Sequence, residues 1–185
     1  MKINFFKSIT LIFLILITLI IYLSVIGIET DKFNNQVKKK IINTDRNLDL
    51  ELKKINLTLD LINFRVNAKT IGTKIFYSKK ILPLEYIKTQ ISLSSLIKKK
   101  IISSNIEVAT RSILLKDLIK FIRAVDNSPQ LFIAEQIIKK GQIILDLKFN
   151  FDQNGKIADD YEIKGSLKDG KIDFLKDKKI ENINF

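Results

Sequence analysis

The feature that most constrains this chain is an uncharged apolar stretch near its start, residues 9–28, ITLIFLILITLIIYLSVIGI. Twenty helical residues rise about 30 Å, which is the thickness of the hydrocarbon layer of a bilayer. A helix satisfies its own backbone hydrogen bonds in that layer, whereas a single strand or loop does not. We therefore expect residues 1–28 to form a transmembrane anchor and residues 29–185 to form one domain beside the membrane.

The apolar stretch is predicted to be a retained anchor rather than a cleaved signal peptide. It is longer than the usual apolar core of a signal peptide, and residues 24–27 match a small-x-small cleavage site poorly. Its orientation stays open on charge alone. Lys2 and Lys7 favour a cytoplasmic N-terminus, whereas Lys32 and the lysine run at 38–40 favour the reverse.

The composition removes most nucleophilic and zinc-based mechanisms and leaves open only an active site built from carboxylates. The chain has no cysteine and no histidine, which excludes thiolate chemistry and removes the commonest metal ligand and proton shuttle. Asp159 and Asp160 are adjacent acidic residues, but adjacent residues of a strand point to opposite faces and do not converge on one metal ion. Neither a glycine-rich phosphate loop nor a nucleophile motif is present. We predict no catalytic residue, no metal and no cofactor.

The net charge is compatible with more than one partner. Residues 29–185 carry 30 basic and 20 acidic residues, a net charge of +10. This charge suits an anionic membrane surface or nucleic acid, or it reflects only a composition rich in lysine. Because no aromatic-basic motif is present, nucleic acid is not a predicted partner.

A short amphipathic helix is predicted directly after the anchor, at residues 31–43. Phe33, Val37 and Ile41 recur every four residues on one side, and Thr30 or Asp31 is a candidate N-cap. This helix either lies on the lipid headgroups or covers the end of the sheet that follows.

Beyond residue 47 the apolar period changes to two, which predicts strands with one apolar and one wet face. The parity shifts at 53–54 and again before Phe64, and each shift predicts a bulge or a turn. Breaks are expected at Gly72 and at 78–80, and a polar corner at 98–100. Residues 113–125 return to a helical period, with Ser112 as the predicted cap and 126–129 as the end.

The last third alternates over residues 143–151 and again over 161–168. Asn154-Gly155 predicts the tight hairpin between these strands, and Asp169-Gly170 predicts a second hairpin. The fold class is therefore α+β and mainly β: a curved antiparallel meander of about eight strands, forming an open groove or a partly rolled sheet, with one covering helix. The alternation still runs at Phe185, so either the sheet closes into a barrel or the chain is a shortened version of something longer.

This order of elements resembles the N-terminal region of AsmA-like proteins, which are relatives of TamB and of the chorein-type bridge-like lipid-transfer proteins. The stretches that carry the resemblance are 9–28, 31–43, 46–68, 82–109 with the helix that follows, and 152–175. They are similar in pattern and order, without a catalytic motif.

The resemblance implies a rolled open sheet whose apolar concave side holds phospholipid acyl chains and passes them between membranes. It also implies a single-pass anchor in a bacterial inner membrane, a periplasmic domain, and a role in envelope and outer-membrane biogenesis. Known relatives are much longer, and eight strands at about 4.8 Å spacing make a sheet only about 40 Å wide.

Two functions remain open on the sequence. One is phospholipid handling along the apolar side of the sheet, and the other is a membrane-anchored scaffold or outer-membrane assembly factor that pairs a partner with its open edge. In the first function, the apolar residues of the sheet line a groove for lipid. The alternative for the same residues is an ordinary core packed by the helix at 113–125. The predicted lipid-binding residues are Ile87, Ile91, Leu93, Ile106, Val108, Leu145, Leu147, Phe149, Phe151, Tyr161, Ile163 and Leu167.

Overall fold

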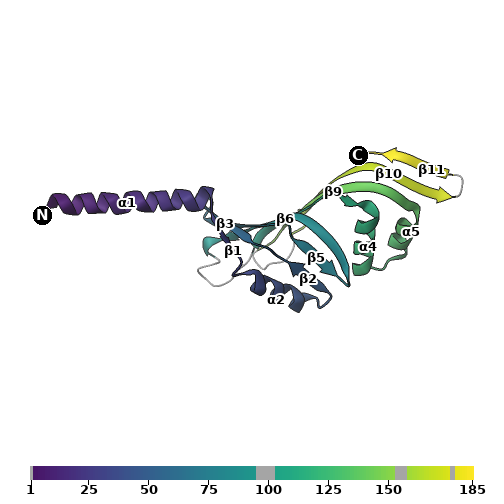
Figure 1. Ribbon diagram of the computed structural model, residues 1–185, viewed down its shortest axis with the longest axis horizontal. Coiled ribbons are helices and arrows are strands. Elements are labelled where there is room, and N and C mark those ends of the chain that lie inside the picture. The colour runs from purple at the N-terminus through teal and green to yellow at the C-terminus, as the bar shows by residue number, and fades with distance from the viewer. Residues whose placement is uncertain (1, 95–102, 153–157, 176–177) are drawn as a thin grey trace.

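The computed structural model describes residues 2–94, 103–152, 158–175 and 178–185. Four helices lie in these ranges, and one of them, at the N-terminus, projects away from the rest of the chain (Figure 1). The helices are α1 (Lys2–Val25), α2 (Asn34–Thr44), α4 (Leu115–Val125) and α5 (Pro129–Ile137). The strands are β1 (Ile28–Thr30), β2 (Leu48–Glu51), β3 (Ile55–Asp60), β4 (Arg65–Ile71), β5 (Lys74–Tyr77), β6 (Lys80–Ser92), β7 (Ser103–Thr110), β8 (Ile113–Leu114), β9 (Ile138–Asn150), β10 (Glu162–Leu175) and β11 (Lys178–Ile183).

The strands form one open antiparallel sheet. Its main path is β1-β3-β4-β6-β7-β9-β10-β11, with β2 and β5 added beside the first part of β6 and β8 added to β9. The path does not return to its start, so the predicted mainly β, unclosed antiparallel sheet is confirmed. Across the residues that the structure describes, it has eleven strands rather than about eight. Strands as short as β1 and β8 are too short to show an alternation of apolar and polar residues, so the sequence pattern does not predict them.

Both predicted parity shifts separate strands. Residues 52–54 divide β2 from β3, and the two strands pair with different neighbours, β2 with β5 and β3 with β4. Residues 61–64 form the turn between β3 and β4, where Phe64 has a φ of 51°. The predicted corner at 98–100 and the predicted Asn154-Gly155 hairpin lie outside the described residues.

The predicted hairpin at Asp169-Gly170 is wrong, because β10 continues through both residues. Asp169 has a φ of 55°, and the register between β9 and β10 shifts between Lys168 and Lys171. A positive φ is needed in some bulges as well as in hairpin turns. The dipeptide therefore lies at a β-bulge within β10. The next strand, β11, pairs with β10 from Gly170 to Leu175.

The predicted helix caps are also wrong. The N-cap of α2 is Phe33, and Thr30 Oγ1 instead accepts a hydrogen bond from the Lys32 N–H at 3.2 Å. The N-cap of α4 is Leu114, because residues 113–114 pair with β9 as strand β8. The Ser112 hydroxyl donates to Gln142 Oε1 across that pairing, at 3.4 Å.

A second helix, α5, follows α4 where the sequence analysis expected only one helix. Ser128 is its N-cap and Pro129 its first residue, so the segment that ends α4 also starts α5. Its apolar residues do not gather on one side of the helix, so the sequence shows no helical period that would predict it. Arg123 of α4 joins the two helices, because it forms an ion pair with Glu135 and stacks 4.9 Å from the ring centre of Phe132.

The buried core lies where the sheet bends over α4 (Figure 1). Leu118, Ile119 and Phe121 of α4 are buried, and the helix contacts β5, β6, β8 and β9. At the same end of the sheet, Leu84, Ala109, Ile113 and Leu167 are buried. By contrast, α2 contacts β2, with Val37 and Ile41 part-buried, as in the second of the two alternatives for this helix, in which it covers part of the sheet.

Candidate functional site

One helix of the described residues is long and apolar enough to span a membrane. It comprises Phe6–Val25 of α1, with a mean hydropathy of 2.7 and none of the span buried. The helix passes directly into the sheet edge through Gly27, which has a φ of 77°. A Cβ at this position would lie 2.4 Å from the Leu57 carbonyl oxygen, and Asn56 Nδ2 donates to the Ile26 carbonyl at 3.3 Å.

The strand register places the predicted lining residues on one side of the sheet. Ile87 lies opposite Val108, Val108 opposite Leu147, and Leu147 opposite Ile163. Directly opposite residues of neighbouring strands share a face. This row therefore crosses four strands from β6 to β10 on one face, which we call the apolar face.

The remaining predicted residues extend that face at both ends. A second row runs from Ala68 through Thr89 and Ile106 to Phe149, and Ile91 lies opposite Val66. Alternation places Leu145 and Leu167 on the same face. Leu93, Phe151 and Tyr161 lie just outside β6, β9 and β10.

Burial on the apolar face decreases along the strands. Leu167, at the end near α4, is only 6% exposed and belongs to the core, whereas Ile163 and Tyr161, at the other end, are each 58% exposed. The other nine predicted residues are part-buried. The less covered end is the one where β6 finishes and where the β3–β4 turn lies, because Arg65 is opposite Ser92 and the Leu93 N–H donates to the Phe64 carbonyl at 2.9 Å.

The less covered end is also the end next to α1. In β3, Leu57 lies opposite Ile28, and β3 runs from there toward the β3–β4 turn. Strand β1 leads away from the end of α1, and β3 is antiparallel to β1, so β3 runs back toward α1. The helix α1 also contacts β3. The apolar face is therefore well covered beside α4 and poorly covered beside the predicted membrane anchor.

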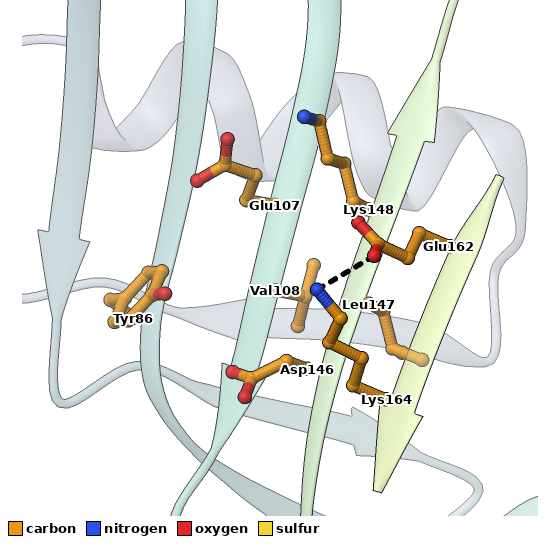
Figure 2. A pocket seen from close by; sticks show the side chains of 8 residues that line it. All are labelled: Tyr86, Glu107, Val108, Asp146, Leu147, Lys148, Glu162 and Lys164. Carbon is orange, nitrogen blue, oxygen red and sulfur yellow. Dashed lines mark ion pairs between the residues drawn. The ribbon is translucent and has the colours of Figure 1, made fainter. Parts of the chain in front are cut away.

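The opposite face carries a row of alternating charges. Lys88 lies opposite Glu107, Glu107 opposite Lys148, and Lys148 opposite Glu162. Beside this row is a hollow of about 250 Å³ (Figure 2). The residues of this face that line it are Tyr86, Glu107, Asp146, Lys148, Glu162 and Lys164, and it also touches Val108 and Leu147, whose positions alternate onto the apolar face.

Two of the charged residues in this hollow form an ion pair. Lys164 Nζ lies 2.7 Å from Glu162 Oε1 (Figure 2). Their hydrogen bond lowers the pKa of the Glu162 carboxyl and raises the pKa of the Lys164 amine. Both groups therefore stay ionised at neutral pH, and neither is suited to accept or donate a proton there.

Of the two adjacent acidic residues, Asp160 is hydrogen-bonded to a neighbouring amide. Asn150 Nδ2 donates to the backbone oxygen and to Oδ2 of Asp160, at 3.2 and 2.9 Å. Among the residues that the structure describes, no three histidine, cysteine, aspartate or glutamate side chains gather where they would hold a metal ion.

No family model matches this chain, no curated protein matches it, and no solved structure matches it. The similarity to AsmA-like proteins thus rests on the order and pattern of its elements alone.

The sequence pattern predicts no functional role for the turn between β3 and β4. Leu61, Ile62 and Phe64 in this turn are exposed apolar residues, and Ile62 is 92% exposed. The only signal in the sequence was the parity shift before Phe64, which predicts a turn but not its surroundings.

Proposed function

We propose that this chain is a single-pass membrane protein whose apolar face binds phospholipid acyl chains, as in the AsmA-like proteins that it resembles. The observation that carries the proposal is the decrease in burial along that face. An ordinary core is covered throughout, whereas here the residues beside α1 remain part-buried or exposed. Large exposed apolar areas in soluble domains usually bind a partner or a lipid.

In this proposal α1 is a retained anchor, so the uncovered end of the face lies beside a lipid reservoir. An acyl chain that leaves the bilayer there exchanges one apolar environment for another. Each methylene kept out of water is worth about 0.8 kcal/mol. Because the rows of the face consist mostly of aliphatic and aromatic side chains, an acyl chain finds no strong binding point and slides along it. No catalysed reaction and no cofactor are needed.

The resemblance also supplies the cellular setting of the proposal. It favours a bacterial inner membrane with residues 29–185 in the periplasm, and a role in envelope or outer-membrane biogenesis. Eight strands along the main path, at about 4.8 Å each, give a sheet close to 40 Å wide. A sheet of this width does not bridge two membranes by itself. We therefore propose that the chain takes up lipid and passes it to further strands or to a partner.

The proposal is tested with the full chain in vesicles that contain a phospholipid with a photoactivatable group on one acyl chain. After irradiation, peptides from β7 and β9 should carry the lipid. The double variant Leu147→Asp, Phe149→Asp should lose most of this labelling, because it places two charges on the apolar face. The matched control Asp146→Asn, Lys148→Gln changes the opposite face of the same strand and should be labelled normally.

Ile163→Asp is a milder second variant, since its side chain is exposed and its replacement leaves the core intact. Labelling of β9 should decrease in this variant as well. Unchanged labelling in both Asp variants would show that the apolar face does not bind lipid.

An alternative function, a scaffold that binds a partner strand, is favoured by a different observation. The outer edge of β10 pairs with β11 from Gly170 to Leu175, and Leu167 exchanges two backbone hydrogen bonds with Phe185, at 2.7 and 3.1 Å. Within the described residues, no strand pairs with the outer edge of residues 162–166. Unpaired edges readily accept a further strand. Native mass spectrometry separates the two functions, because it shows bound phospholipid for the first and a bound polypeptide for the second.

A further inference from the structure

The turn between β3 and β4 carries an unusual apolar surface. Leu61, Ile62 and Phe64 are exposed to 38, 92 and 69%. The polar groups at the base of the turn bond to each other, because Asp60 Oδ1 accepts the Asn63 backbone N–H at 3.0 Å and Asp60 Oδ2 accepts the Asn63 side-chain amide at 2.9 Å. The turn therefore presents apolar side chains outward, while the Asp60 carboxylate and the Asn63 amide hold its base together.

The strand register places this turn beside the last part of α1. Leu57 of β3 lies opposite Ile28, and the turn begins four residues further along β3, in the direction of the helix. At about 3.3 Å per residue, Leu61 lies about 13 Å beyond Leu57 along the strand. This distance carries the turn past the level of the junction at Gly27, on the side from which α1 enters, and α1 contacts β3.

The burial pattern of α1 agrees with this placement. Between Phe6 and Ile26, the part-buried residues of the helix are Ile20, Leu23 and Ser24, and Gly27 is buried after them. Their spacing puts them on one side of the helix, the side where β3 lies against Gly27. From Ile20 to Gly27 a helix rises about 10 Å, which is close to the length by which β3 and its turn extend past the junction.

The last two turns of α1 belong to the segment long enough to span a membrane, which ends at Val25. A turn that lies beside them is at the level of the lipid headgroups and the upper acyl chains if α1 spans the bilayer. Exposed apolar side chains at that level are buried by lipid, as in helices that lie in the interface.

We propose that the β3–β4 turn, residues 61–64, inserts into the membrane surface beside α1 and forms a second membrane contact. The occupant of this apolar surface is the bilayer itself, because the turn is continuous with the side of α1. The contact holds the poorly covered end of the apolar face against the lipid. The inference rests on α1 as a transmembrane helix, which is part of the proposed function, but not on lipid binding by the apolar face.

Because the chain has no cysteine, single-cysteine variants of the full chain test this directly. Ile62→Cys is labelled with an environment-sensitive fluorophore and the protein is reconstituted in vesicles of phosphatidylethanolamine and phosphatidylglycerol. Ile81→Cys is the matched control, since Ile81 is also an exposed isoleucine, 52%, at the opposite end of β6 from the turn. Leu14→Cys reports on the middle of α1.

The label at Ile62 should emit at shorter wavelength than the label at Ile81, and quenching by aqueous iodide should be several-fold weaker. A nitroxide near the top of the acyl chain should quench it more than a nitroxide near the chain end. Equal iodide quenching at Ile62 and Ile81, with Leu14 inaccessible to iodide, would overturn the insertion of the turn alone. Iodide access at Leu14 would overturn the transmembrane assignment and the turn insertion together, whereas the labelling of β7 and β9 by photoactivatable lipid is a separate result.

Discussion

The Nζ atom of Lys88 lies 3.3 Å from Oε2 of Glu107 on the polar face of the sheet. The pair is the start of the row Lys88–Glu107–Lys148–Glu162, in which the sign of the charge alternates across β6, β7, β9 and β10. Opposite charges on neighbouring strands stabilise a pairing, and like charges weaken it. The row therefore favours the register that also aligns Ile87, Val108, Leu147 and Ile163 on the apolar face.

Reversing one charge in the row should weaken the sheet. Glu107→Lys would place a lysine between Lys88 and Lys148, and should lower the free energy of unfolding by about 1–2 kcal/mol, the sum of two cross-strand pairs. The measurement is urea unfolding of the full chain in detergent micelles at low and high salt. The loss should shrink at high salt, where these charges are screened. Glu107→Gln is the control, and a Lys variant as stable as the Gln variant would rule out a role of the row in register.

Adding a side chain at the junction of α1 and the sheet should be costly. In Gly27→Ala the new Cβ meets the Leu57 carbonyl oxygen at 2.4 Å, and the φ of 77° is strained for alanine. Gly72→Ala has a similar φ of 68°, but its Cβ meets only Arg111 Nη2, at 3.6 Å. In the control, the free energy of unfolding should thus decrease only by the cost of the backbone strain, about 1–2 kcal/mol. Thermal unfolding by circular dichroism should show a clearly larger loss for Gly27→Ala, and equal losses would contradict the tight junction.

The two ends of the apolar face should respond differently to truncation. Leu84 is 1% exposed beside α4, so Leu84→Ala should cost about 2–5 kcal/mol through the cavity it leaves. Ile163→Ala, at the exposed end, should change the free energy of unfolding by less than about 1 kcal/mol, as is usual for surface positions. Both values come from the same denaturant titration. A large loss at Ile163 would mean that this end of the face is a packed core.

The ion pair between α2 and β2 predicts a pH dependence. Lys38 Nζ lies 3.0 Å from Asp49 Oδ2, and this hydrogen bond lowers the pKa of Asp49 below 3.8. Because the folded state favours the ionised carboxylate, the stabilisation is present above the unfolded pKa and is lost as pH falls through the folded pKa. Lys38→Gln should raise the pKa of Asp49, measured by carbon NMR of its carboxyl group. Lys39→Gln removes the same charge from α2 without removing the hydrogen bond and should leave this pKa nearly unchanged.

The alternation of residues predicted which side chains share a face better than it predicted the limits of the elements. Leu147 and Phe149 fall on one face because successive side chains of a strand point in opposite directions, which is a local property. The caps at Ser112 and Thr30 and the hairpin at Asp169-Gly170 were wrong. In each case the local motif fits two structures, and pairing with a distant strand selects between them. Pairing of β1 with β3 holds Thr30 in a strand, pairing of β8 with β9 displaces the start of α4, and pairing of β10 with β11 continues through Gly170.

The sequence by itself determined that the chain has an apolar helix long enough to cross a membrane and strands with one apolar face. Both follow from the spacing of apolar residues along the chain. Only the tertiary structure decided which part of the apolar face is covered, and that β3 runs back toward α1 before the turn at residues 61–64. These relations depend on the antiparallel pairing of β1 with β3 and on the packing of α4 on one end of the sheet, and no local pattern encodes contacts between segments so far apart.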